Sequence, residues 1–155
     1  MHFIQSQTHN STHVKAPYKY DENGVDIAAM PLEKYMGEAV VCDFDDKLGK
    51  ALDADDMMAC DSRRDDIVLM RTSEKDISRQ PYLGWEAVDW LIETGIKAFG
   101  KDDSDSKMLL AGIPILDAVT GLEQITKPPV FFIGLPVKIR RVTASWARAI
   151  VLEER

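Results

Sequence analysis

The sequence predicts an α/β fold built as a single domain over residues 1–155. Short apolar stretches of the length of buried strands alternate along the chain with segments of helical periodicity, the pattern typical of α/β proteins. Glycine and proline occur as isolated residues, so no linker or domain boundary is indicated. A chain of this length buries roughly 68–70% of its unfolded surface, which is enough for a substantial core.

The first half of the chain is predicted to be mainly extended. Residues 1–20 alternate in polarity, and Pro17 disfavours a helix before it, so we expect an extended segment followed by a turn at 21–24. Pro31 at a first helical position and Gly37 beyond the last predict a short helix over 31–36.

Two longer helices and six strands complete the predicted fold. Helix 84–95 has Trp85, Val88 and Leu91 at helical spacing, and Gly95 is placed to end it. A second helix is predicted over 103–111. The predicted strands are apolar runs bounded by polar or turn-forming residues: 39–44, 65–71, 96–100, 113–116, 130–133 and 147–152. The acidic clusters between them are interpreted as solvated loops and caps.

Composition limits the classes of partner. The formal net charge is -7 and the pI about 4.9, which argues against nucleic acid or an anionic membrane as the main partner. No apolar run is long enough to span a bilayer, and the N-terminus lacks the features of a signal peptide. Cys42 lies in an apolar run and is predicted to be a free buried thiol, with Cys60 as the other cysteine. We therefore expect a cytoplasmic protein.

The N-terminal segment carries the candidate site. His9 and His13 are followed by Lys15 and Lys19. Neutral imidazoles are common ligands for zinc and similar metals, but two ligands alone hold a metal poorly. From the spacing alone, a metal site and a pair of surface or capping histidines both remain open.

The order of motifs resembles the Putative cyclase family, which includes bacterial kynurenine formamidases and isatin hydrolases. The similar segments are His-x-x-Thr-His-Val-x-Ala-Pro at 9–17, Pro-Leu-Glu at 31–33, the strand ending in Arg-Thr at 66–72, the Leu-Leu segment at 109–116 and the Arg-containing strand at 147–150. The resemblance implies a swivelling β/β/α domain, with a mixed sheet or small barrel and outer helices. It further implies hydrolysis of a small amide, ester or lactam, and a homo-oligomer, either dimer or tetramer.

The resemblance also implies a set of site residues. Metal-binding members carry His-x-x-x-His-x-Asp-x-x-x-His, and here Lys15 and Lys19 stand at the Asp and final His positions. A later His position falls at Ser106, and a Glu position falls at Asp117. The implied ligands of a divalent metal cofactor, zinc or manganese, are therefore His9, His13 and Asp117. Since an ammonium repels a metal cation, we expect weak metal affinity. Family members usually have a segment before the first histidine, so we expect part of the usual fold to be absent.

The two lysines leave two functions open. Lys15 or Lys19 acts in catalysis as a fixed positive charge that polarises a carbonyl, or as a base or nucleophile of lowered pKa. Alternatively, the protein is a catalytically inactive member that binds a small anionic or carbonyl ligand or serves as an assembly partner, and we expect little arylformamidase activity. Catalysis requires Lys15, His9 and His13 to converge in a closed pocket, whereas a remnant site allows the lysines to point to solvent.

Overall fold

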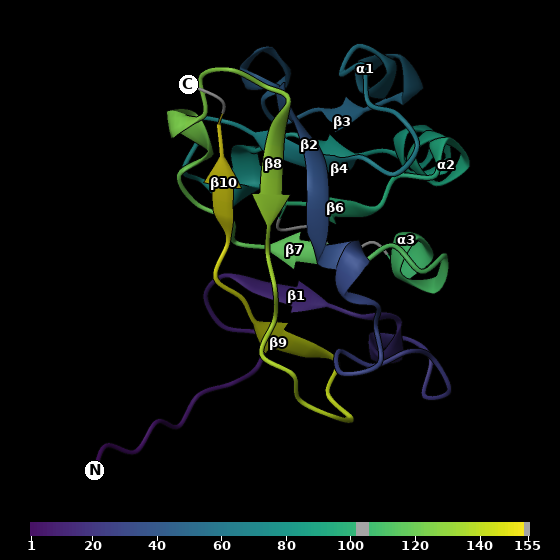
Figure 1. The fold of residues 1–155 in the computed structure, drawn as a ribbon. Coiled ribbons are helices and arrows are strands. Elements are labelled where there is room, and N and C mark those ends of the chain that lie inside the picture. Colours follow the sequence, from purple (N-terminus) through teal and green to yellow (C-terminus); the bar gives the residue numbers. More distant parts are fainter. Residues whose placement is uncertain (102–105, 154–155) are drawn as a thin grey trace.

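The fold is built on a curled, eight-stranded mixed sheet with its helices packed to one side (Figure 1). The computed structural model describes residues 1–101 and 106–153. The strands of the large sheet are β1 (His13–Lys15), β2 (Met36–Asp43), β4 (Ile67–Arg71), β6 (Ala98–Gly100), β7 (Ile115–Asp117), β8 (Val130–Ile133), β9 (Ala144–Trp146) and β10 (Ile150–Leu152). A separate two-stranded sheet pairs β3 (Ala51–Leu52) with β5 (Tyr82–Leu83).

The large sheet has a parallel centre and antiparallel margins. Its order is β10-β8-β2-β4-β6-β7-β1-β9, and the four central strands β2, β4, β6 and β7 are parallel. At one margin β8 pairs antiparallel with β2, and β10 pairs antiparallel with β8; at the other margin β1 lies antiparallel between β7 and β9. The predicted fold class is therefore confirmed: a mixed, half-barrel sheet with outer helices.

The bounds of the main helix confirm the prediction of a helix over 84–95. Helix α2 spans Trp85–Thr94 and ends at Gly95, whose φ of 77° is readily adopted only by glycine. Its buried residues include Val88 and Leu91, as the spacing predicts. Trp85, in contrast, is 75% exposed, because it lies in the first turn, where the side chain faces solvent. Trp85 was expected in the core or at an interface, and its exposure places it outside the core of this chain.

Two further helices are short. Helix α3 covers Ser106–Leu110, and the first part of the predicted helix, residues 103–105, lies outside the described residues. Helix α1, Ala54–Met58, was not predicted, but Asp53, from an acidic cluster interpreted as loops and caps, does cap it through a reciprocal capping box with Asp56. The 3-10 turns are Pro17–Lys19, Leu32–Tyr35, Asp45–Lys47, Ile77–Arg79 and Leu122–Gln124.

The sheet separates two hydrophobic clusters. Along β4, Val68 packs into the cluster beneath the helices, whereas Ile67 and Leu69 enter the cluster inside the curl of the sheet. This alternation follows from the two-residue period of a strand. Both faces of the parallel centre are therefore buried, which leaves the strand ends and the margins for surface functions.

The prediction of a free thiol at Cys42 is wrong. Cys42 and Cys60 form a disulfide, with their Cα atoms 5.5 Å apart. Sequence spacing could not show this, because the pairing depends on the turn after α1 that returns the chain to β2. Among the described residues, no helix is both long and apolar enough to cross a membrane.

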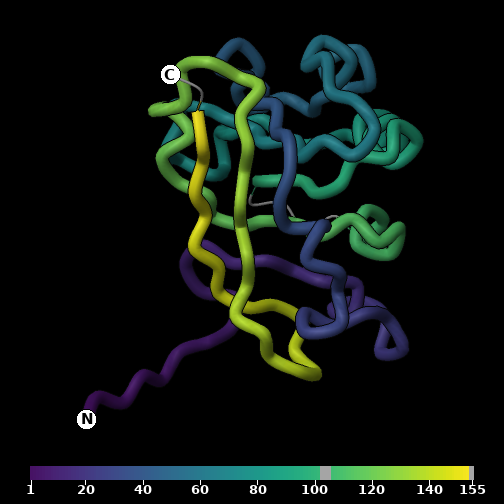
Figure 2. The backbone as a smooth tube through the Cα atoms, in the orientation of Figure 1, coloured from purple at the N-terminus to yellow at the C-terminus, as the bar shows by residue number. Residues whose placement is uncertain are grey.

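The N-terminal residues form an arm that extends away from the body (Figure 2). Phe3 and Ile4 on this arm are 88% and 81% exposed. The arm joins the body where Trp146 Nε1 donates a hydrogen bond to Gln7 O at 2.8 Å. The candidate motif begins two residues later, so this contact fixes its start against β9.

Candidate functional site

Strand pairing brings the motif to Asp117. In β1, His13 lies directly opposite Asp117 of β7, and Lys15 lies opposite Ile115. Residues two apart on a strand share a face, so the His13 and Lys15 side chains project on the same side as Asp117. The site is therefore assembled across the β1–β7 pair, from residues about one hundred positions apart in the sequence.

A buried ion pair forms the floor of the site. Lys15 Nζ contacts Asp117 Oδ2, and the two side chains are only 4% and 2% exposed. Both residues lie on inner strands of the sheet, because β1 pairs with β7 along one edge and with β9 along the other. A lysine enclosed in this way needs a compensating charge, and Asp117 supplies it.

His13 is held beside this ion pair. Its Nδ1 lies 2.7 Å from Ser11 O, and since a carbonyl oxygen can only accept, Nδ1 carries the proton. Its Nε2 lies 3.2 Å from Asp117 Oδ2. His13 is itself buried, so it belongs to the floor of the site rather than to its rim.

His9 stands at the exposed rim. Its ring meets that of His13 edge-on, with centroids 5.2 Å apart, and its Nε2 lies 2.8 Å from Thr143 Oγ1. Partial burial lowers the pKa of His9 below its usual 6.5, and nearby His13, Lys19 and Lys15 lower the pKa further. His9 is therefore neutral at pH 7 and able to accept a proton.

Lys19 completes the site from the far side of the motif. It lines an open depression of about 390 Å³ together with both histidines, Lys15 and Asp117. Its Nζ also lies 5.1 Å from the centre of the Tyr20 ring, a cation–π distance. Two lysines and one carboxylate line the depression, so its lysines outnumber its acid.

This set of side chains does not fit a divalent metal ion. The Lys15 ammonium contacts the carboxylate that the resemblance assigns as a ligand, so a metal cation at Asp117 would have to displace it. The described residues contain no group of three or more His, Cys, Asp or Glu side chains arranged to hold a metal. That His9, His13 and Asp117 are ligands stays a prediction, although the fold does place all three around one depression.

The structure brings all five predicted site residues to one depression, and it adds a partner that the sequence did not indicate. Thr143, the partner of His9, precedes β9, a strand absent from the predicted elements. The sequence signal for β9 was the alternation of apolar and polar residues over 142–146, which is too short to identify a strand by itself. Ser106, at a family histidine position, begins α3, is exposed and is not among the residues lining the depression.

Comparison with known proteins gives a consistent result. Residues 2–106 match the sequence model of the family described as Putative cyclase. A kynurenine formamidase of Erythrobacter litoralis is 32% identical over 94% of this chain and 74% of its own. Isatin hydrolase A from Ralstonia solanacearum superposes with a TM-score of 0.82 at 23% identity, covering 95% of this chain and 73% of the other. A structure described as a potential metal-dependent hydrolase with cyclase activity has a TM-score of 0.81 at 20% identity, covering 96% and 81%.

Proposed function

Because the chain belongs to the Putative cyclase family, we propose that it is a slow hydrolase of a small amide, ester or lactam that works without a metal ion. The observation that supports this is the convergence of Lys15, His13 and His9 beneath one depression, with Lys15 buried rather than directed to solvent. The buried charge pair holds the site in shape, and the groups at the rim are left to act on the substrate.

In this proposal Lys19 and His9 carry the chemistry. The Lys19 ammonium donates a hydrogen bond to the substrate carbonyl and stabilises the negative charge that develops on its oxygen. His9, neutral at pH 7, accepts a proton from the water that attacks the carbonyl carbon. As the tetrahedral intermediate collapses, the bond to nitrogen or oxygen breaks and His9 returns the proton to the leaving group. When Nε2–H of His9 donates to Thr143, Nδ1 is the atom that takes up the proton.

Lys15 has a positioning role here, which differs from the role expected of it. Its charge is compensated by Asp117, and its ammonium is enclosed, so it is poorly placed to contact a substrate in the open depression. Its ion pair instead keeps β1 and β7 aligned and holds His13 and the rim histidine in place.

A ligand-binding function without turnover is the second candidate. The observation that favours it is the compensation of Lys15 by Asp117, which leaves Lys19 as the one lysine placed at the rim of the depression. Such a site can hold a small anionic or carbonyl-bearing ligand while lacking the electrostatic stabilisation of the transition state that catalysis needs.

Hydrolysis of N-formylaniline, followed by aniline release, separates the two candidates. With chelator present, wild type should show slow turnover. His9→Gln should lower kcat/KM about a hundredfold, and Lys19→Gln should do so by a similar factor. The exposed Lys138→Gln serves as a matched control and should be unchanged.

Two results would reject the metal-free mechanism. Turnover that appears only when zinc or manganese is added, and disappears with chelator, would assign the reaction to a bound metal. Wild-type turnover no higher than that of His9→Gln, together with saturable binding of N-formylaniline, would instead support the ligand-binding function.

A further inference from the structure

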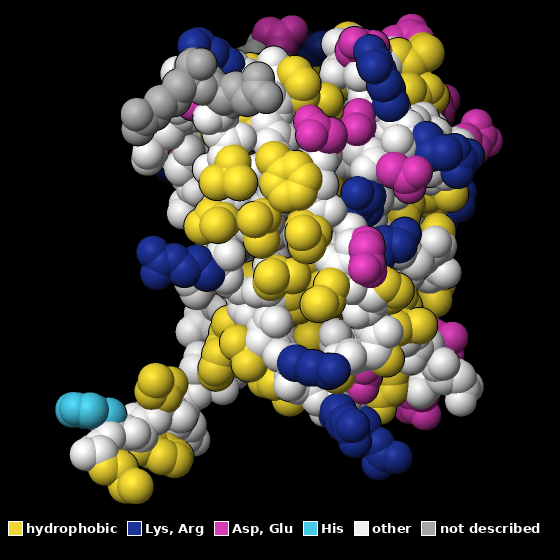
Figure 3. All heavy atoms as spheres, in the orientation of Figure 1, with side chains coloured by type: hydrophobic (Ala, Val, Ile, Leu, Met, Phe, Trp, Pro, Cys, Tyr) yellow, Lys and Arg dark blue, Asp and Glu magenta, His cyan; other side chains and the backbone are white. Residues whose placement is uncertain are grey.

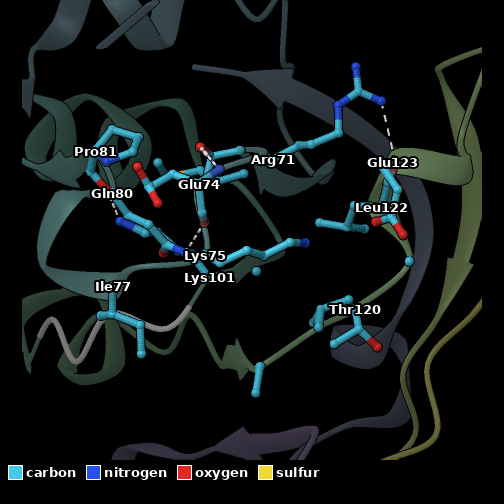
Figure 4. A pocket seen from close by; sticks show the side chains of 16 residues that line it. Arg71, Glu74, Lys75, Ile77, Gln80, Pro81, Lys101, Thr120, Leu122 and Glu123 are labelled. Atoms are coloured by element: carbon cyan, nitrogen blue, oxygen red, sulfur yellow. Dashed lines mark hydrogen bonds between the residues drawn. The ribbon is translucent and has the colours of Figure 1, made fainter. Parts of the chain in front are cut away.

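A second cavity, which the proposed hydrolysis does not use, lies at the carboxyl ends of the parallel strands. It has a volume of about 320 Å³ and is walled by the residues that follow β4, β6 and β7 (Figure 4). This volume is at the lower end of the range found for small-molecule sites. In open α/β sheets, ligands bind outside the carboxyl ends of the strands, which is where this cavity opens.

The cavity has apolar walls on facing sides. Ile77 and Pro81 stand on one side, and Leu122 stands on the other (Figure 4). Ile77 is 66% exposed although it is a large apolar residue, whereas Leu122 is nearly buried. An apolar body inserted between them would remove the Ile77 side chain from water, which is a favourable contribution to binding.

The segment that carries Ile77 is held in a defined shape. Asp45 Oδ1 accepts hydrogen bonds from Thr72 Oγ1 at 2.9 Å and from Ser73 N at 2.7 Å. Gln80 Nε2 donates to Glu74 O at 2.8 Å. The first two bonds tie the start of the segment to Asp45, and the third joins its end to its start, so the wall is formed before any ligand arrives.

Charged groups line the same hollow, and most of them have structural partners. Arg71 donates to Asp43 Oδ2 at 3.0 Å and to the Leu122 and Ile125 carbonyls, which fixes the loop after β7. Lys101 Nζ contacts Pro81 O.

The remaining charged residues that line the cavity are two carboxylates, Glu74 and Glu123, and one cation, Lys75. Glu74 accepts from Asp76 N at 3.0 Å and lies 3.4 Å from Arg79 Nε, whereas Glu123 is an exposed carboxylate near the Leu122 wall. Lys75 is exposed, and no carboxylate of the described residues lies within ion-pair distance of it. Lys75 is therefore a lining cation that a ligand carboxylate can engage without breaking an ion pair between described residues.

We propose that this cavity binds a small organic acid, a monocarboxylate with an apolar body. The apolar body lies between Ile77 and Leu122, and the carboxylate pairs with Lys75. Ala118 lines both this cavity and the lysine–histidine depression, so the two sites adjoin through one residue but use different cations. Binding here does not depend on hydrolysis at the other site.

Calorimetric titration of the full chain with benzoate tests the proposal. Benzoate should bind saturably, and the uncharged isostere benzamide should bind about tenfold more weakly, because it cannot pair with Lys75. Lys75→Gln should weaken benzoate binding by a similar factor. Thr120→Phe, which places a ring at the exposed rim of the cavity, should abolish it. Lys138→Gln is the matched control and should leave it unchanged.

Lys19→Gln distinguishes the two sites. The proposal is supported if Lys19→Gln binds benzoate as wild type does and Lys75→Gln binds it more weakly. The opposite pattern would place benzoate in the lysine–histidine depression and overturn it, as would an absence of saturable benzoate binding to wild type. Lys75 is exposed, so its substitution does not threaten folding. The comparison of Lys75→Gln with Lys19→Gln therefore remains decisive even if Thr120→Phe lowers stability.

Discussion

Replacing Lys15 by methionine should destabilise the protein strongly. Met has a similar length but no charge, so Lys15→Met leaves the Asp117 carboxylate, 2% exposed, beside His13 without its ammonium. Removing one partner of a buried ion pair costs about 3–5 kcal/mol, a large share of a typical domain's stability. We expect a loss of that size in the free energy of unfolding, measured by urea denaturation at pH 7.

Two companion variants make this result interpretable. Lys15→Met/Asp117→Asn removes both charges and should recover much of the loss, because replacing both partners of a buried pair costs far less than removing one. Lys47→Met removes the ammonium from a far more exposed pair with Asp56 and should have a much smaller effect. A Lys15→Met loss equal to that of Lys47→Met, or unchanged when Asp117→Asn is added, would refute the buried-pair reasoning.

Three other changes should have measurable effects. The folded-state pKa of His9 is lowered, so the unfolded chain binds more protons below pH 6.5 and wild type loses stability as the pH falls; thermal melts of His9→Gln should show less of this loss. Cys42→Ser/Cys60→Ser opens a loop with a sequence separation of 18 and should cost about 3 kcal/mol in urea, and wild type should show no free thiol. We propose that the apolar surface over β8 and β10 (Figure 3) joins copies of the chain, so Ile150→Lys/Leu152→Lys should lower the mass seen by light scattering.

Sequence patterns predicted the elements whose signals are local. The apolar run at 130–133 matches β8, and Gly95 ends α2 as expected. The missed strand β9 is three residues long and contains a buried serine, so neither its length nor its polarity distinguishes it from a loop. Its stability comes from pairing with β1, a contact that only the assembled sheet provides.

The site could be predicted as a set of residues but not as an arrangement. The motif identified His9, His13, Lys15 and Lys19, and family order pointed to Asp117. Which lysine would be buried depends on the β1–β7 register and on the 3-10 turn that begins at Pro17, and both are decided by long-range packing. The sequence therefore could not separate a structural lysine from one at the rim.

The register explains why Lys15 and Asp117 are coupled. Position 15 shares a face with His13, and that face is covered, so any charge there must be compensated within the fold. Asp117 is the acid opposite His13, and its carboxylate meets the ammonium directly. A metal ion and the Lys15 ammonium would compete for this one carboxylate, so the lysine predicted to weaken metal binding is also the cation paired with Asp117 in this structure. Structure and chemistry at this position are therefore set by the same ion pair.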